Sequence, residues 1–530
     1  MAAGSAPAAT QSGFLGWIER TGNRLPDPVL LFVYFIAVLI ALSVVASLAG
    51  WSAAHPAEID PDTGTFRIVT VESLLSEANL RQLFTSVPET FTHFAPLGMV
   101  LTVMLGAGVA ERSGLFTAAM QASVARASRF WLTPSVALAC MMANHAADAA
   151  FVVMIPLAGI IYHAAGRHPL VGIGVAFASV SGAFSANLLP GQLDALLLGI
   201  TEEAVQTVFG AYTVNIAGNW YFIAAMTLAY LPVIWFVTDR VVEPRLGRYD
   251  AATASAAADD DDVGKPLSPG EKRGLRNAGL VALALVALWA FLVLGPIQPL
   301  VDPDAPPAGR LTPFYQSLLP FFLLIFLLPG YAFGRAAGTI GGHRDLIAMM
   351  SEAMKDMAYY LVLTFVAAHF VAMFAWSNMG IVLAVDGADA LKASGLPMWA
   401  MLVAIVLFGA ALNLLVGSAS AKWAVMAPVL VPMLMLVGVS PEMTTAAYRV
   451  GDSATNIITP LMVYFPLVLI FCQRWVKEFG LGSLTALMMP YFFGIMTAGL
   501  AITITWVVFD LPLGPGVNVF LDALPAAAQS

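Results

Sequence analysis

Residues 448–460 read YRVGDSATNIITP, which places an arginine, an aspartate and a helix-breaking proline inside an otherwise apolar part of the chain. A related stretch, SANLLP, occupies residues 185–190. Each stretch follows an apolar segment with a small polar centre, NHAAD at residues 144–148 in one half of the chain and GSASAK at residues 417–422 in the other. The parts occur in the same order in both halves, so the sequence predicts an internal repeat.

The two copies align on their prolines. When Pro156 is placed on Pro428, Pro169 falls on Pro441, and the later proline and asparagine fall into line after gaps of two and three residues. Few residues are identical between the copies, so the shared order of parts carries the prediction.

The composition is that of a membrane protein. Of 530 residues, 59% are hydrophobic and 11% are charged, and the mean hydropathy is +0.82. Soluble domains contain about 25% charged residues, so this chain lies outside that class. A bilayer core about 30 Å thick needs ~20 apolar residues per helix. Nine such runs occur: Val29–Gly50, Phe94–Ala110, Val171–Pro190, Trp220–Val237, Leu280–Ile297, Pro313–Phe333, Met357–Ser377, Thr455–Phe471 and Leu484–Phe509.

Cysteine content and net charge give little further information. Cys140 and Cys472 both lie in apolar segments, so no disulfide framework or zinc-ligand spacing is indicated. The net charge of -9 comes partly from four aspartates at residues 259–262, in an Ala-rich linker typical of a solvated loop. No signal-peptide cleavage pattern precedes the first apolar run, so we expect that run to insert as a helix. We expect no nucleic-acid partner.

Loop charges predict how the halves are oriented, because Lys and Arg accumulate on the cytoplasmic side. Residues 51–90 are rich in Asp and Glu, whereas residues 239–277 contain seven Lys and Arg. We therefore expect five regions. They are a cytoplasmic N-terminus (1–28), a first membrane half (29–238), a cytoplasmic linker (239–277), a second membrane half (278–509) and a periplasmic tail (510–530).

Two segments read as re-entrant hairpins, near residues 131–164 and 397–437. In each, two apolar arms meet at polar residues, where an ordinary span would be uninterrupted. Non-helical backbone at that depth is tolerated only when it is buried in protein or lines a wet cavity. Counting sides puts the two hairpin mouths on opposite faces of the membrane. The predicted fold is therefore an all-α polytopic membrane protein, with nine transmembrane helices and two hairpins in an inverted repeat.

Four ionisable residues lie in apolar surroundings, where an unpaired charge costs several kcal/mol and a functional role is the default hypothesis: Asp148, Asp194, Arg449 and Asp452. Arg449 and Asp452 are three residues apart, so on a helix they share a face and could pair with each other. Alternatively, Arg449 presents its planar fork to a substrate carboxylate while Asp452 balances the charge or takes up a proton. Both readings stay open at the level of sequence.

The polar residues of the broken segments suit a dehydrated Na⁺, because proline frees backbone carbonyls one turn back. The candidate residues for the hairpins and the ion are Asn144, Asp148, Ser185, Asn187, Asn413, Ser418, Ser453, Thr455 and Asn456. No other metal and no cofactor are expected. The absence of a G-x-x-x-x-G-K-[ST] motif makes an ATP-driven motor within the chain improbable, so coupling would be to a gradient of Na⁺ or H⁺. Trp423 could stack on an aromatic solute or could simply pack between helices.

Transport is the leading interpretation, and other classes make distinguishable predictions. An intramembrane aspartyl protease would need Asp148 or Asp194 close enough to Asp452 to share a proton, and the sequence before Asp452 is Arg-Val-Gly rather than Gly-x-Gly. A passive channel would not accumulate its solute. We therefore expect a transporter and no enzyme activity.

The motifs at residues 417–423 and 448–460, together with residues 143–150 and 185–194, resemble those of the AbgT family, the p-aminobenzoyl-glutamate transporters. The resemblance covers nearly the whole chain. It implies a bacterial inner-membrane homodimer with nine transmembrane helices and two re-entrant hairpins per subunit. It also implies a small aromatic carboxylate as substrate, or export of sulfonamide antimetabolites. A Na⁺-coupled carrier of another dicarboxylate is the alternative within transport. The residues that the resemblance places along the substrate pathway are Asp194, Ser420, Trp423, Pro441, Arg449, Asp452 and Pro460.

Overall fold

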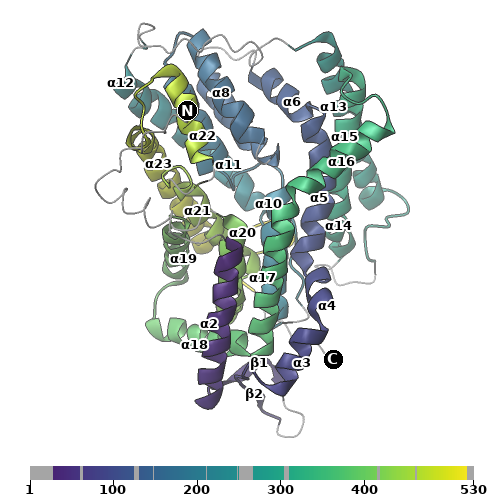
Figure 1. Ribbon diagram of the computed structural model, residues 1–530, viewed down its shortest axis with the longest axis vertical. Helices are drawn as coiled ribbons and strands as arrows, with labels where there is room; N and C mark the ends of the chain where they lie inside the picture. The colour runs from purple at the N-terminus through teal and green to yellow at the C-terminus, as the bar shows by residue number, and fades with distance from the viewer. Residues whose placement is uncertain are drawn as a thin grey trace, which may run out of the picture.

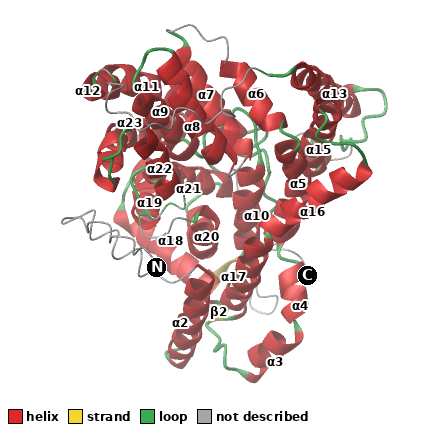
Figure 2. Cartoon of the chain, turned by 45° about the horizontal axis from the view of Figure 1, so that its top comes forward, coloured by secondary structure: helices red, strands yellow, loops and turns green. Residues whose placement is uncertain are grey.

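The computed structural model describes residues 28–59, 64–124, 130–146, 149–209, 212–247, 249, 267–303, 310–414, 418–459, 462 and 464–521. Two predicted site residues, Asp148 and Pro460, lie outside these ranges, as do residues 1–27 of the N-terminal region and the four linker aspartates. The described chain is mostly helical (Figures 1 and 2), which confirms the predicted fold class.

Among the residues that the structure describes, six helical segments are long and apolar enough to cross a membrane. Five of them are single helices: α2 (Pro28–Leu48), α13 (Pro269–Leu294), α15 (Leu318–Ala337), α17 (Ala358–Trp376) and α23 (Leu481–Phe509). The sixth is α11 (Trp220–Val237), which continues through η3 (Thr238–Val242) and α12 (Glu243–Leu246). Helix α5, with 18 residues, spans Ala95–Arg112. The chain is therefore a multi-pass membrane protein, and the count of nine crossings stays a prediction.

Two of the nine apolar runs leave helical geometry at the Asn- and Pro-containing motifs, where the sequence predicts broken helices. The run at 171–190 contains α9 (Pro169–Phe177) and a π-helical turn, η2 (Ala178–Gly182), and then leaves helical geometry before α10 (Gln192–Gln206). The run at 455–471 is divided between α21 (Pro441–Thr455) and α22 (Phe465–Trp475). Both interruptions coincide with the Asn- and Pro-containing motifs, so local chemistry outweighs apolar length at these points.

Both predicted hairpins appear as two helices separated by a break. The first consists of α7 (Leu132–Ala143), a 3-10 turn η1 (Asn144–Ala146) and α8 (Ala149–Ala164). The second consists of α19 (Met398–Asn413) and α20 (Ala419–Met435). The Ser418 hydroxyl starts α20 by accepting the Ala421 N–H at 3.3 Å, a normal N-cap.

The two halves place their helices in the same order. In the first half α5 and α6 (Leu115–Val124) precede the hairpin, and α9, α10 and α11 follow it. In the second half α17 and α18 (Met379–Ser394) precede the hairpin, and α21, α22 and α23 follow it. The packing is also related, because α15 of the second half lies against α5 of the first half, and α2 of the first half lies against α17 of the second half.

The core forms around α21, in which every residue from Pro441 to Thr455 is buried. It is packed against α10, α19, α20 and α23. Close approach to α19 depends on Gly451, because a Cβ there would lie 2.0 Å from the carbonyl oxygen of Val406. By contrast, α2 and α13 leave many large apolar side chains exposed, as lipid-facing helices do.

One feature departs from an all-helical chain. Strands β1 (Ser52–Ile59) and β2 (Phe66–Thr70) form an antiparallel pair outside the long helices. They lie at the opposite end of the molecule from α12 (Figure 1). Short helices α3 (Glu77–Thr85) and α4 (Val87–Thr92) follow them, and α14 (Thr312–Gln316) and α16 (His343–Asp356) flank α15.

The described part of the predicted tail is held against the protein. The Leu513 carbonyl accepts from the N–H of Tyr221 at 2.8 Å, and the Val519 carbonyl accepts from Ser440 at 2.9 Å. This segment therefore joins the start of α11 to the start of α21.

Candidate functional site

A buried ion pair joins α10 to α21. Nη1 of Arg449 lies 2.6 Å from Oδ1 of Asp194, and the two side chains are 1% and 4% exposed. The other carboxylate oxygen of Asp194 accepts the N–H of Gly191 at 2.8 Å, at the end of the first broken segment. Nε of Arg449 is buried without a hydrogen-bond partner among the described residues. A donor of a buried guanidinium is therefore left over, and it could bind an oxygen of a ligand.

A second buried ion pair joins α20 to α21. Nζ of Lys422 lies 2.6 Å from Oδ1 of Asp452, with side chains 2% and 3% exposed. Lys422 also donates to Oδ1 of Asn413, at the end of α19. The possibility that Arg449 pairs with Asp452 is therefore wrong, because each residue has a partner from another helix. Asp194 and Asp452 are held by separate cations and do not form the shared-proton dyad that a protease would need.

Sequence reasoning did not select Lys422 as a site residue. In the sequence, Lys422 is the last residue of the polar centre of the second hairpin. A lysine between two apolar arms could have indicated a site residue, because a buried ammonium group requires a partner.

The amide of Asn413, the last residue of α19, joins the second hairpin to the C-terminal end of α21. Its Nδ2 lies 2.7 Å from the Asp452 carbonyl oxygen, 2.8 Å from Thr455 Oγ1 and 2.7 Å from Asn456 Oδ1. One asparagine from the hairpin thus satisfies acceptors near the C-terminal end of α21. Three of the candidate ion residues are brought together in this way.

The two broken segments touch each other at the centre of the molecule. The Ser453 hydroxyl donates to the Ser185 hydroxyl at 2.7 Å, and Nδ2 of Asn456 donates to the Ser181 carbonyl at 3.3 Å. Near the first break, Oδ1 of Asn187 and both polar amide atoms of Asn144 are buried without partners among the described residues. In the first half, the asparagines of the hairpin and of the broken segment therefore have polar atoms without hydrogen bonds to other described residues. In the second half, the corresponding asparagines, Asn413 and Asn456, are hydrogen-bonded to each other.

Trp423 is fully buried and packed. Its ring stacks on Tyr448 with a centroid distance of 4.5 Å, and Nε1 lies 2.9 Å from Thr201 Oγ1. In this conformation the geometry favours packing over contact with a solute. Ser420 lies 3.4 Å from the Ser418 hydroxyl, and Pro441 is the buried first residue of α21 after the N-cap Ser440. Their place on a substrate pathway stays a prediction.

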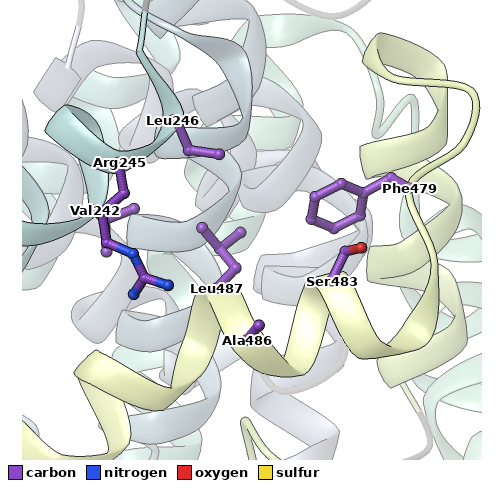
Figure 3. Close-up of a pocket in the computed structure, with 7 residues that line it drawn as sticks. All are labelled: Val242, Arg245, Leu246, Phe479, Ser483, Ala486 and Leu487. Atoms are coloured by element: carbon purple, nitrogen blue, oxygen red, sulfur yellow. The ribbon is translucent and has the colours of Figure 1, made fainter.

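Two cavities lie away from these ion pairs. Figure 3 shows one of about 250 Å³, where the Arg245 guanidinium and the Ser483 hydroxyl border an apolar floor that includes Phe479 and Leu487. A larger one of about 510 Å³ lies between α13, α15 and the first break, and is lined mainly by aromatic and aliphatic side chains. His145, from the first hairpin, is at its wall. Neither lining includes Arg449 or Asp452.

An ionic cluster fixes the opposite end of the first hairpin. Arg167, in the turn between α8 and α9, lies 2.6 Å from Asp239 and 2.5 Å from Glu243. Its guanidinium is also 4.6 Å from the ring centroid of Tyr162. Burial acts to lower the pKa of Arg167, but the hydrogen bonds with the two carboxylates outweigh it and raise the pKa. The arginine therefore stays charged and ties the hairpin to η3 and α12.

Comparisons with known proteins agree with this architecture. The sequence model of the AbgT transporter family matches residues 13–521. The p-aminobenzoyl-glutamate transport protein of Escherichia coli (strain K12) is 36% identical over 518 residues, which cover 98% of this chain and 99% of that protein.

Two solved structures are also similar. The YdaH transporter of Alcanivorax borkumensis, whose topology is described as unusual, has a TM-score of 0.84 and 42% identity, covering 92% of this chain and 100% of that one. MtrF of Neisseria gonorrhoeae, described as illuminating a class of antimetabolite efflux pumps, has a TM-score of 0.88 and 41% identity, covering 95% and 100%. Together, the whole-length family match, these relatives and the paired broken helices show that this chain belongs to the AbgT family of transporters.

Proposed function

We propose that this protein is an ion-coupled secondary transporter of p-aminobenzoyl-glutamate or a related small aromatic carboxylate. The buried Arg449 carries the proposal, because its Nε has no partner among the described residues and a carboxylate is the natural acceptor for an arginine fork. The substrate named for the Escherichia coli relative contains both an aromatic ring and carboxylates. The relative described as an efflux pump supports export of antimetabolites as the second candidate activity.

The coupling ion in this proposal is Na⁺ or H⁺. The unsatisfied Asn144 and Asn187 near the first break support an ion contact there, because amide oxygens are ligands for hard cations. Asp452 and Asp194 are the groups that could carry a proton. We further propose a homodimer in the bacterial inner membrane, which native mass spectrometry of the detergent-solubilised protein would test by its mass.

The experiment is counterflow in proteoliposomes. Vesicles loaded with unlabelled p-aminobenzoyl-glutamate are diluted into a trace of the radiolabelled compound, and labelled uptake is followed with no ion gradient. We expect transient accumulation of label that empty liposomes do not show. Absence of counterflow with folded protein would contradict the proposed substrate.

Competition separates this substrate class from the alternative Na⁺-coupled dicarboxylate carrier. Unlabelled p-aminobenzoate and glutamate each contain one part of the substrate. We expect the intact aromatic amide to compete best, because the ring and the carboxylates are bound together. If succinate or glutamate competed as well as the intact compound, a general dicarboxylate carrier would be favoured.

A further inference from the structure

The cavity of Figure 3 combines an apolar floor with a polar rim. Residues of η3 and α12 border it on one side, and the turn before α23 and the first turns of α23 border it on the other. The floor consists of Val242, Leu246, Phe479, Ala486 and Leu487, and the rim consists of Arg245 and Ser483. Its volume of about 250 Å³ lies below the ~300–1,000 Å³ of pockets that enclose a whole small ligand. The cavity therefore suits part of a larger molecule.

The two rim groups have no partner in the part of the chain that the structure describes. Neither the Arg245 guanidinium nor the Ser483 hydroxyl takes part in an ion pair or hydrogen bond with another described residue. The carboxylates that precede Arg245 in the chain, Asp239 and Glu243, both bind Arg167 instead. A guanidinium has five N–H donors, so Arg245 is available to an anion from outside the chain.

The cavity lies where the protein leaves the membrane. Helix α12 is the end of the membrane-spanning segment that begins with α11, and it lies at the opposite end of the molecule from β1–β2 (Figure 1). The Lys- and Arg-rich residues 239–277 begin here, so the loop charges predict that this end is cytoplasmic. The cytoplasmic leaflet contains anionic lipids, and basic pockets between membrane helices on that side bind their head groups.

We propose that this cavity binds one anionic phospholipid of the cytoplasmic leaflet. The Arg245 guanidinium binds the lipid phosphate, the Ser483 hydroxyl donates to a second phosphate oxygen, and part of an acyl chain covers the apolar floor. Arginine suits this role because its planar donor fork matches the oxygens of a phosphate. The inference adds a lipid site to the proposed transporter, and it does not depend on which solute or ion is carried.

The lining distinguishes an anionic phospholipid from two related ligands. Inorganic phosphate would satisfy the rim but would leave the apolar floor in contact with water, which is unfavourable. A zwitterionic phospholipid would cover the floor, but its amine needs an acceptor, and no acidic side chain is among the described residues that line the cavity. A phospholipid with a net negative charge fits both the rim and the floor.

A lipid bound here joins the two halves of the chain. Arg245 follows the first membrane half, whereas Ser483 lies in the first turn of α23, in the second half. Helices α11 and α23 already pack against each other, and Arg167 connects α12 to the end of the first hairpin. A ligand that binds only the folded state stabilises that state. We therefore expect the anionic lipid to raise the thermal unfolding temperature.

The test is native mass spectrometry of the full-length protein in detergent, titrated with phosphatidylglycerol or with phosphatidylethanolamine of the same acyl chains. Arg245→Gln removes the charge, and Arg245→Lys keeps a cation without the fork. Ala486→Leu narrows the floor and changes no charge. Arg240→Gln is the matched control, because Arg240 is an exposed arginine of η3 that does not line the cavity. Thermal unfolding without added lipid shows whether each variant is folded.

We expect phosphatidylglycerol to bind the wild type roughly tenfold more tightly than phosphatidylethanolamine, and Arg245→Gln to lose about that factor. Arg245→Lys should keep part of the preference, and the control should match the wild type. Ala486→Leu should weaken the binding of both lipids, because both use the floor. Phosphatidylglycerol should also raise the unfolding temperature of the wild type, and inorganic phosphate should not.

Three binding results would overturn the inference: equal affinity of the wild type for the two lipids, unchanged phosphatidylglycerol affinity in Arg245→Gln, or unchanged affinity in Ala486→Leu. An equal loss in the control would also overturn it, because any arginine at this surface would then serve. If inorganic phosphate alone raised the unfolding temperature as much as the lipid does, the site would be one for a soluble anion.

The comparison of the two lipids and the phosphate measurement use the wild type, so they remain decisive even if a variant does not fold. Absence of substrate transport would contradict the proposed function and would leave this inference standing. The two failures are therefore distinguishable.

Discussion

Replacing Arg449 by lysine tests whether the guanidinium fork binds the substrate. Lysine keeps a positive charge for Asp194, which lies 2.6 Å from Nη1 in the wild type. It removes the planar fork and the unpartnered Nε. If one charge-assisted hydrogen bond to a substrate carboxylate is lost, the cost is about 1.5–3 kcal/mol, or roughly 10- to 150-fold in Kd. Because the ion pair with Asp194 can persist, we expect the fold to be retained.

The assay is equilibrium binding of radiolabelled p-aminobenzoyl-glutamate to the purified protein in nanodiscs, with thermal unfolding measured on the same samples. Arg245→Lys is the matched control, because Arg245 borders the cavity of Figure 3 and not the ion pairs. Wild-type affinity in Arg449→Lys, with the control also unchanged, would refute the reasoning. Arg449 would then be a structural partner of Asp194 and no more.

Two other substitutions separate packing from function. Trp423→Phe should keep the stacking on Tyr448 but lose the bond from Nε1 to Thr201, which lowers stability by about 1 kcal/mol and leaves substrate affinity unchanged. A large fall in affinity at unchanged thermal stability would place Trp423 against the substrate instead. Arg167→Met should lower stability by roughly 2–3 kcal/mol. The loss stays below that of a fully buried pair because Asp239 and Glu243 are 31% and 30% exposed and can be rehydrated. Unfolding at the wild-type temperature would show that the cluster does not hold the hairpin.

Much of the architecture was predictable because it is encoded locally. Apolar length predicts the long helices, and polar residues with proline predict where α9–α10 and α21–α22 are interrupted. The same local signals select Asp194, Arg449, Asp452 and Asn413, all of which are buried at the centre. A charged or amide side chain in an apolar segment must find partners, so its burial in a polar network follows from the sequence.

The pairing of those residues was not predictable from the same signals. Spacing of three residues on one helix indicates a shared face for Arg449 and Asp452, but long-range packing decides which neighbours they bind. Arg449 binds a residue 255 positions away, and Asp452 binds Lys422 from the preceding hairpin. The β1–β2 pair was also missed, because β1 contains Pro56 and lacks regular alternation, and both features argue against a strand.

The most direct test of the account is accumulation in proteoliposomes. Radiolabelled p-aminobenzoyl-glutamate is followed under an imposed pH gradient and, separately, under an imposed Na⁺ gradient, with the gradient set in each direction. The account predicts concentration of the substrate above equilibrium under at least one of the two gradients. Movement that only ever reaches equilibrium would contradict it, because that is the behaviour of a passive channel.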